Sequence, residues 1–333
     1  MKFGVVEFLT ADQCLRSTVW NRLWDRKEPI LPFWMGSLVH KGVEMYYKAD
    51  RDPANVPVKM LPHIKKQIGW VRKAFGSTLW SEAQKEFLPA RDLSVKMINN
   101  FMDYDQKANP TALKGEIHSV EMKIKQELPS GVIIAGKIDL ILERSDGIWL
   151  IDHKTAARAL DAMSVDVDDQ ATAYAWLFWK ESGIVIKGFA FNVLYKLAPE
   201  PPPLIRKDTA LSKSKSLGTT EVLYKQAVKA QGFKLKDYKE IILHYKREGW
   251  NPFFEIVDTL RSLPEIKQFE AFASHKSERL VRAVEDPDTY AYPSGSIYNC
   301  GWCPYKGACK IQSEGGDADI VLQNKFMPNT YSS

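Results

Sequence analysis

The sequence of 333 residues contains no apolar run that approaches the roughly 18 residues needed to cross a bilayer. Its first residues, MKFGVVEFLTADQC, lack the basic segment and following apolar stretch of a secretory signal. From these two absences we expect a cytoplasmic protein with no membrane association. Cysteine is also scarce, and in a reducing compartment the four cysteines are expected to be free, catalytic or metal-binding rather than disulfide-bonded.

A strong net charge is absent as well. The chain carries 46 basic and 41 acidic side chains, a formal charge of +5, which permits a polyanionic partner without requiring one. The excess is local, because residues 204–249 contain eleven Lys or Arg against five acidic residues. Within this segment, 211–216 is expected to be a mobile basic loop. The segment is either a solvated linker with a surface helix or an insertion that contacts phosphates through Lys213, Lys215 and Lys225.

Periodicity predicts an α/β fold with its sheet in the middle of the chain. Alternating or continuous apolar residues predict strands at 120–125, 132–143, 148–153 and 184–195. Asp146-Gly147 between two of these strands is a strong hairpin signal. Asp168 and Asp169 predict the start of a helix that runs through Lys180, because acidic residues favour helix N-termini. The order strand–strand–strand–helix–strand predicts a mixed sheet flanked by helices.

These elements divide the chain into regions. We expect a helical N-terminal region (1–110), a sheet core (111–200), the basic insertion (201–249), a C-terminal helical region (250–312) and a polar, loosely held tail (313–333). The segment Gly131–Lys137 has the glycine and lysine spacing of a phosphate-binding loop, but Ile138 stands where Ser or Thr is required. No ATPase motor is therefore expected, and any helicase would be a separate protein.

Two carboxylates and a lysine on the predicted hairpin are the clearest candidates for chemistry. Asp152 and Lys154 point to the same face of a strand, and the hairpin can bring Asp139 beside Asp152. Carboxylates are hard ligands that suit Mg²⁺ or Mn²⁺. A lysine beside them would lie next to an attacking water and a scissile phosphate, where charge develops. The alternative is an Asp–Lys ladder on an exposed strand.

The pattern Gly136-Lys-Ile-Asp139 followed by Ile151-Asp-His-Lys-Thr155 resembles the core of the PD-(D/E)xK nucleases. It is specifically similar to the RecB-like branch, which includes the nuclease domains of RecB and AddB and the CRISPR-associated RecB-like exonucleases. That branch also has a histidine on an upstream helix, where Gly36-Ser-Leu-Val-His40 fits, and Gln-x-x-x-Tyr after the lysine. The resemblance covers about residues 10–310, and it implies a restriction-endonuclease-like core.

The resemblance also implies a role for each matching residue. The metal ligands would be His40, Asp139, Asp152 and the backbone carbonyl of His153. Lys154 would orient or activate the attacking water and stabilise the charge on the phosphate, and the His153 side chain would point away from the metal. Gln170 and Tyr174, which share a helix face, would position the substrate strand. Glu121 is interpreted as a salt-bridging residue on a solvated face, with a supporting role at the metal as the alternative.

The cysteines are arranged as three near the C-terminus and one far upstream. Two residues separate Cys300 from Cys303, five separate Cys303 from Cys309, and Cys14 lies near the N-terminus. A CxxC pair alone is ambiguous between zinc and redox use. The layout is similar to that of iron–sulfur members of the same nuclease branch, in which four thiolates hold a [4Fe–4S] cluster. Zinc and unliganded thiols are the alternatives.

The resemblance favours a metal-dependent DNA nuclease, an exonuclease of strand ends that works in DNA end processing, recombination or repair. Single strands or ends are the implied substrate, and a helicase or recombination proteins are the implied partners. Two alternatives stay open. One is a DNA-binding module that retains the fold and the cluster but does not cleave. The other is a nuclease that processes CRISPR spacers, which would use the same site and differ in its partners.

Overall fold

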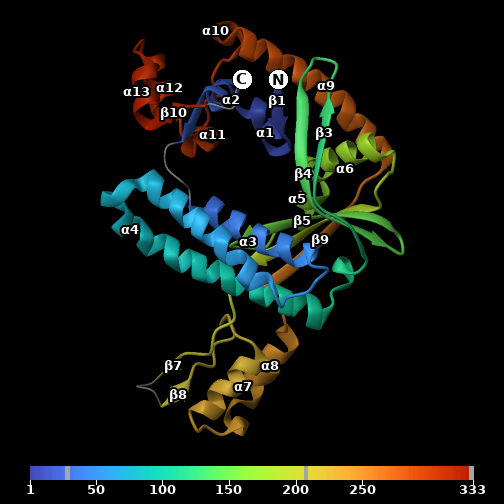
Figure 1. Cartoon of the computed structure of the whole chain (residues 1–333), viewed down its shortest axis with the longest axis vertical. Helices are drawn as coiled ribbons and strands as arrows, with labels where there is room; N and C mark the ends of the chain where they lie inside the picture. The colour runs from blue at the N-terminus through green and yellow to red at the C-terminus, as the bar shows by residue number, and fades with distance from the viewer. Residues whose placement is uncertain (27–30, 206–208, 330–333) are drawn as a thin grey trace.

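The computed structural model describes residues 1–26, 31–205 and 209–329. Its centre is a six-stranded mixed sheet in which β4 contacts three other strands (Figure 1). β3 pairs antiparallel along almost the whole of one edge of β4, while β1 and β5 share the other edge. β5 then continues the sheet through β6 to β9. The strands are β1 (Lys2–Gly4), β3 (Glu116–Glu127), β4 (Ile133–Arg144), β5 (Gly147–Ala156), β6 (Gly188–Tyr195) and β9 (Phe254–Leu260).

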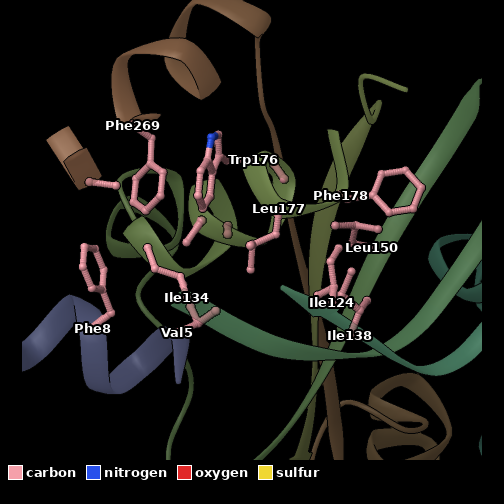
Figure 2. Packing of buried hydrophobic residues seen from close by; sticks show 14 of the residues in the cluster. Val5, Phe8, Ile124, Ile134, Ile138, Leu150, Trp176, Leu177, Phe178 and Phe269 are labelled. Carbon is pink, nitrogen blue, oxygen red and sulfur yellow. The ribbon is translucent and has the colours of Figure 1, made fainter. Parts of the chain in front are cut away.

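Helices cover both faces of this sheet, which confirms the predicted mixed sheet flanked by helices. On one face, β4 and β5 pack against α1, α6 and α9 around buried residues such as Phe8, Leu150, Trp176 and Phe269 (Figure 2). On the other face, α3 and α4 pack through Leu38, Tyr47 and Phe101. These helices are α1 (Val5–Thr10), α3 (Leu31–Lys48), α4 (Val56–Ala108), α6 (Asp169–Ser182) and α9 (Leu263–Glu285).

The N-terminal region is helical, but two short strands in it escaped the periodicity analysis. β1 adds to the central sheet, and β2 (Trp24–Arg26) pairs with β10 (Phe326–Pro328) near the other end of the chain. α2 (Leu15–Leu23) lies between them in sequence. Both strands span three residues, which is too short for an alternation signal to be read.

The prediction of a loosely held tail from Ser313 is wrong for the residues that the structure describes. Asp317 caps α13 (Ala318–Lys325) by accepting a hydrogen bond from the backbone of Asp319. Leu322 and Phe326 are buried in a cluster with Tyr305, whose ring stacks on that of Phe326. Leu322 and Phe326 therefore anchor this segment by packing, although most of its residues are polar. The remaining C-terminal helices are α10 (Pro287–Tyr290), α11 (Ile297–Gly301) and α12 (Lys306–Ser313).

The basic segment is a folded unit with its own core, not a linker. Its core contains Leu211, Tyr224, Val228, Tyr238, Ile241, Ile242 and Tyr245. The expected mobile loop is tied to this core, because the hydroxyls of Tyr224 and Tyr245 donate to the backbone carbonyls of Ser212 and Ser214. The elements are β7 (Leu204–Ile205), β8 (Ala210–Leu211), α7 (Glu221–Ala230), a 3₁₀ turn (Leu235–Tyr238) and α8 (Lys239–Glu248) (Figure 1). Residues 206–208 of the expected basic run lie outside the described part.

Four short segments complete the fold: α5 (Ala162–Asp166) and the 3₁₀ turns at Ala11–Gln13, Thr111–Leu113 and Leu235–Tyr238. α4 contains Gly76 with φ +68°, a left-handed conformation that breaks the helix into two parts. Within the described residues, no helix combines the length and the apolar character needed to cross a membrane.

Candidate active site

The candidate site lies where β4 and β5 separate. The two strands pair from Arg144–Gly147 up to Leu140–Ile151, and beyond that point no further pair forms. β1 occupies the same edge of β4 only as far as Ala135, so the edge between Gly136 and Asp139 is left open. Asp139 bridges the gap, because its Oδ2 accepts a hydrogen bond of 2.9 Å from the backbone N–H of His153. The divergence of the two strands therefore places the carboxylate of Asp139 in the gap between β4 and β5.

His40 approaches this carboxylate from α3. Its Nδ1 lies 3.3 Å from Asp139 Oδ2, and the close fit of α3 on β5 leaves Gly36 next to Thr155. Burial acts to raise the pKa of Asp139, but the hydrogen bond and charge of His40 outweigh it and lower the pKa to about 2. Burial likewise opposes the charged form of His40, yet Asp139 raises the pKa of that imidazole overall. Asp139 therefore favours the charged form of the His40 imidazole.

Asp152, Lys154 and Gln170 form a triangle on the other side of the gap. Lys154 Nζ lies 2.8 Å from Asp152 Oδ2 and donates to Gln170 Oε1 at 3.1 Å. Gln170 Nε2 donates to Asp152 Oδ1 at 3.0 Å, so one amide fixes both charged groups. Burial raises the pKa of Asp152 to about 6 despite the neighbouring lysine. Asp152 Oδ2 is buried, and the ammonium group of Lys154 is its charged partner.

The side chain of His153 points to the opposite face, as the alternation of the strand predicts. It is buried among Tyr47 and Phe101, and its ring stacks on Tyr47 with centroids 5.7 Å apart. Its Nδ1 lies 2.8 Å from Asn192 Nδ2. Burial lowers the pKa of His153 to about 4, so the ring is neutral and belongs to the core.

The first turns of α6 carry Gln170 of the triangle and two further residues of the site, Asp168 and Tyr174. Asp168 caps the helix by accepting from the backbone of Gln170 and Ala171, which confirms its interpretation as a cap. Tyr174, one turn after Gln170, packs against Gly136, where a Cβ would lie 2.6 Å from the tyrosine ring. The glycine of the Gly-x-x-Asp pattern is therefore needed for the close approach of an aromatic ring.

Arg261 anchors the start of α6 by hydrogen bonds, and no sequence motif predicts this role. The side chain is only 5% exposed and has no acidic partner among the residues described. It donates to the hydroxyl of Thr172 and to the backbone carbonyls of Val165 and Asp168. Because Arg261 follows Asp168 by more than ninety residues, no local pattern could connect the two.

Glu121 also differs from its expected place. It forms the predicted salt bridge, with Lys137, but its side chain is only 10% exposed and lines a cleft of about 760 Å³ together with His40. Its φ of +61° is a left-handed conformation inside a strand. Strained backbone of this kind tends to occur at functional sites. The alternation rule assumes regular strand geometry, so it could not place this side chain.

The residues present suit a hard divalent cation in their chemistry. Two carboxylates and an imidazole border the gap, and a hard divalent cation prefers carboxylate oxygens as ligands. In the arrangement described, Lys154 and His40 neutralise the two carboxylates. In the described ranges, no group of three or more His, Cys, Asp or Glu is placed so that it could hold a metal ion.

The four cysteines gather where α2 meets the C-terminal helices. Cys14, Cys300 and Cys303 line one cavity of about 230 Å³. The fourth, Cys309, lies on α12 with its Sγ 3.9 Å from Arg16 Nη1. All four are free and partly exposed, and the cavity places the distant N-terminal cysteine near two of the three C-terminal ones.

The chain is similar to known proteins in its sequence family and to some solved structures. No curated protein matches the sequence. Solved structures similar to the chain include a proposed exonuclease from Eubacterium rectale, with 12% identity, a TM-score of 0.41 and coverage of 88% of this chain and 84% of that chain. The protein SSO0001 is 10% identical, with a TM-score of 0.30 and coverage of 81% of both chains. The sequence itself matches the PD-(D/E)XK nuclease superfamily over residues 13–310. The chain therefore belongs to the PD-(D/E)XK nuclease superfamily.

Proposed function

We propose that this nuclease is a metal-dependent exonuclease of DNA that belongs to the RecB-like branch and processes strand ends in recombination or repair in the cytoplasm. The observation that carries the proposal is the Asp152–Lys154–Gln170 triangle facing the His40–Asp139 pair across the gap between β4 and β5. A helicase or recombination proteins would supply the ends. Cleavage assays distinguish this proposal from non-cleaving binding. A nuclease that processes CRISPR spacers would use the same site, so identification of the protein's partners by pull-down would separate it.

The metal would be held by His40, Asp139, Asp152 and the backbone carbonyl of His153. Mg²⁺ or Mn²⁺ in such a site supplies Lewis-acid chemistry at the phosphate. For the cation to bind, Lys154 must release Asp152 Oδ2, which turns its ammonium group toward the substrate. Gln170 keeps both side chains in reach, because its amide contacts each of them.

Lys154 would then orient the attacking water and stabilise negative charge on the phosphate. The water oxygen forms a bond to phosphorus, the bond from phosphorus to the leaving oxygen breaks, and the leaving oxygen takes up a proton. Tyr174 and Gln170 lie on one face of α6 and would hold the substrate strand in line.

The test of this chemistry is the change Lys154→Ala. We expect cleavage of an end-labelled single strand with Mn²⁺ to fall by at least about 100-fold, since the change removes a charge at the reacting phosphate. Binding of the same strand should persist. Lys125→Ala, an exposed lysine on β3, is the matched control and should cleave normally. Unchanged cleavage by the Lys154→Ala protein would contradict the assigned role.

The proposed direction of attack, from strand ends, has its own test. A circular single strand has no end, so an exonuclease should degrade the linear form and leave the circle intact. Cutting of the circle would show endonuclease action. A protein that binds both forms and cleaves neither, with Mg²⁺ and with Mn²⁺, would favour the non-cleaving module.

We also propose that the four cysteines hold a [4Fe–4S] cluster. The support is the cavity that Cys14 shares with Cys300 and Cys303, together with the four-cysteine layout of the sequence. Anaerobically purified protein should be brown with broad visible absorbance and contain iron, whereas zinc content without colour would favour a zinc site. Cys14→Ala should lose both iron and solubility. A well-folded, active Cys14→Ala protein would refute a structural cluster.

A further inference from the structure

A second cleft lies on the basic segment, formed by the end of the loop 213–215 and the helical stretch 236–247. It has a volume of about 1010 Å³ and shares no lining residue with the active-site cleft. Six Lys or Arg line it against two acidic residues, Asp237 and Glu240. The unit that carries it projects from the nuclease body beyond α4 (Figure 1).

The fold of the segment directs these charges outward. On α8, Ile241, Ile242 and Tyr245 are buried in the local core, while Lys239 and Lys246 are exposed on the other side. The facing loop is fixed by the bond from Lys213 Nζ to the carbonyl of Asp237 at 2.7 Å. The wall and the floor of the cleft are therefore rigidly connected.

Most cations of the cleft lack acidic partners. Within the described part of the chain, no ion pair forms at Lys215, Lys236, Lys239, Lys246 or Arg247. In contrast, Lys225 on α7 pairs with Glu221 at 2.6 Å and does not line the cleft. The sequence-based expectation for this segment therefore needs revision. Lys213 bonds to the backbone of Asp237 and Lys225 is paired with Glu221, whereas the unpaired cations lie at Lys215, in the 3₁₀ turn and on α8.

We propose that this cleft binds the phosphate backbone of a nucleic-acid strand, as a second contact site outside the active site. Clustered cations without counter-charges repel one another, and a polyanion relieves that repulsion while its counterions are released. Lys239 and Lys246 are seven residues apart, which is about 10 Å along the helix axis. That separation lets the two ammonium groups contact different phosphates of one strand. Because all contacts would be to phosphates, binding is independent of sequence.

The inference rests on the proposed function for its choice of ligand, but its test does not need cleavage. The triple variant Lys236→Gln, Lys239→Gln, Lys246→Gln is made in the full-length Lys154→Ala protein. Its affinity for a labelled single-stranded oligonucleotide is measured by fluorescence anisotropy in EDTA over a range of salt. Each lost contact to a single strand lowers the slope of log K against log salt by about 0.7, so the slope should fall by about 2. At about 0.1 M salt this corresponds to roughly 100-fold weaker binding.

The matched control removes the same charge outside the cleft, with Lys225→Gln, Lys229→Gln, Lys234→Gln. It should leave the slope unchanged, and a triple Lys→Arg variant of the cleft should retain binding. Equal losses in both Gln variants, or an unaltered slope in the cleft variant, would overturn the proposal. Polyglutamate serves as a second probe that mimics an acidic protein. If the cleft variant lost polyglutamate binding but bound the oligonucleotide normally, the proposal would be overturned in favour of an acidic protein as the ligand. Failure of the nuclease proposal is read separately, as absence of cleavage by the unmodified chain.

Discussion

Gly136→Ala would test whether the Gly-x-x-Asp segment and α6 act as one unit. Gly136 lies on the open edge of β4, three residues before Asp139, and the ring of Tyr174 covers it. A Cβ at this position would lie 2.6 Å from Tyr174 Cε1 and 3.0 Å from Val5 Cγ2. Val5 is buried in the core, so the added methyl group has no empty space on either side.

The size of the effect follows from these distances. An ordinary contact begins at about 3.4 Å, so the tyrosine ring must retreat by about 0.8 Å, the difference from 2.6 Å. Overpacking of this kind typically costs about 1–3 kcal/mol in the free energy of unfolding. A displacement near 1 Å in a positioning group can cost about 100-fold in rate. We therefore expect both a lower stability and a lower cleavage rate.

A double-mutant cycle separates the clash from other effects. Tyr174→Ala removes the obstructing ring, so the methyl group should be much better tolerated in the Gly136→Ala, Tyr174→Ala protein. The coupling in unfolding free energy, measured by urea denaturation, should be about 1–3 kcal/mol. Gly69→Ala is the control, because a Cβ there meets nothing within 4 Å. That change in α4 should stabilise the protein slightly.

Additive effects in this cycle would refute the reasoning, because two residues that clash directly cannot act independently. Normal cleavage by Gly136→Ala with a measured loss of stability would show that Tyr174 packs against the strand without positioning the substrate. The two readouts thus test the packing and the proposed role one at a time.

Two further predictions concern buried charges. Arg261→Lys cannot reproduce the hydrogen bonds of the guanidinium group at the start of α6, so the free energy of unfolding should fall by about 2–4 kcal/mol. The kcat for cleavage should fall by a larger factor than the KM changes. A rise in KM with unchanged kcat would contradict a role of Arg261 in positioning Gln170. Burial raises the pKa of Asp105, so the folded state binds that proton more tightly than the unfolded chain, and the resulting stability is lost as pH rises through the folded pKa. The melting temperature of the unmodified protein minus that of Asp105→Asn should therefore decline as the pH rises above about 4, the ordinary pKa of an aspartate. A difference that is constant with pH would refute this prediction.

The parts of the site that local periodicity governs could be predicted from the sequence. Alternation along β5 places Asp152 and Lys154 on one face and the His153 ring on the other. Asp168 has the residue type and position of a helix cap, and it forms those bonds. These features depend only on neighbours within a few residues, so a single sequence contains enough information to infer them.

The parts that depend on distant residues could not be predicted. Arg261 reaches α6 across tertiary space, and the strand at Phe326 pairs with the strand at Trp24 from near the opposite end of the chain. The burial of the Glu121 side chain could not be predicted for a different reason. Its left-handed backbone conformation interrupts the regular alternation on which strand predictions rest. The polar composition of the tail also led to a wrong prediction there. Leu322 and Phe326, which are four residues apart, pack on the same side of the segment and are buried.

The first 26 residues link the cysteines to the open edge of the sheet. β1 pairs with β4 at Ala135, next to Gly136, and Val5 at the start of α1 contacts that same glycine position. A few residues later, Asp12 binds the buried ammonium of Lys276 on α9, and Cys14 follows directly. A displacement of the cysteine region would therefore pull on β1 and α1, which border the gap that contains Asp139. The cysteines are remote from the carboxylates in sequence, but a short, well-anchored segment connects them physically, so loss of the cysteine contacts should loosen the active site as well as the C-terminus.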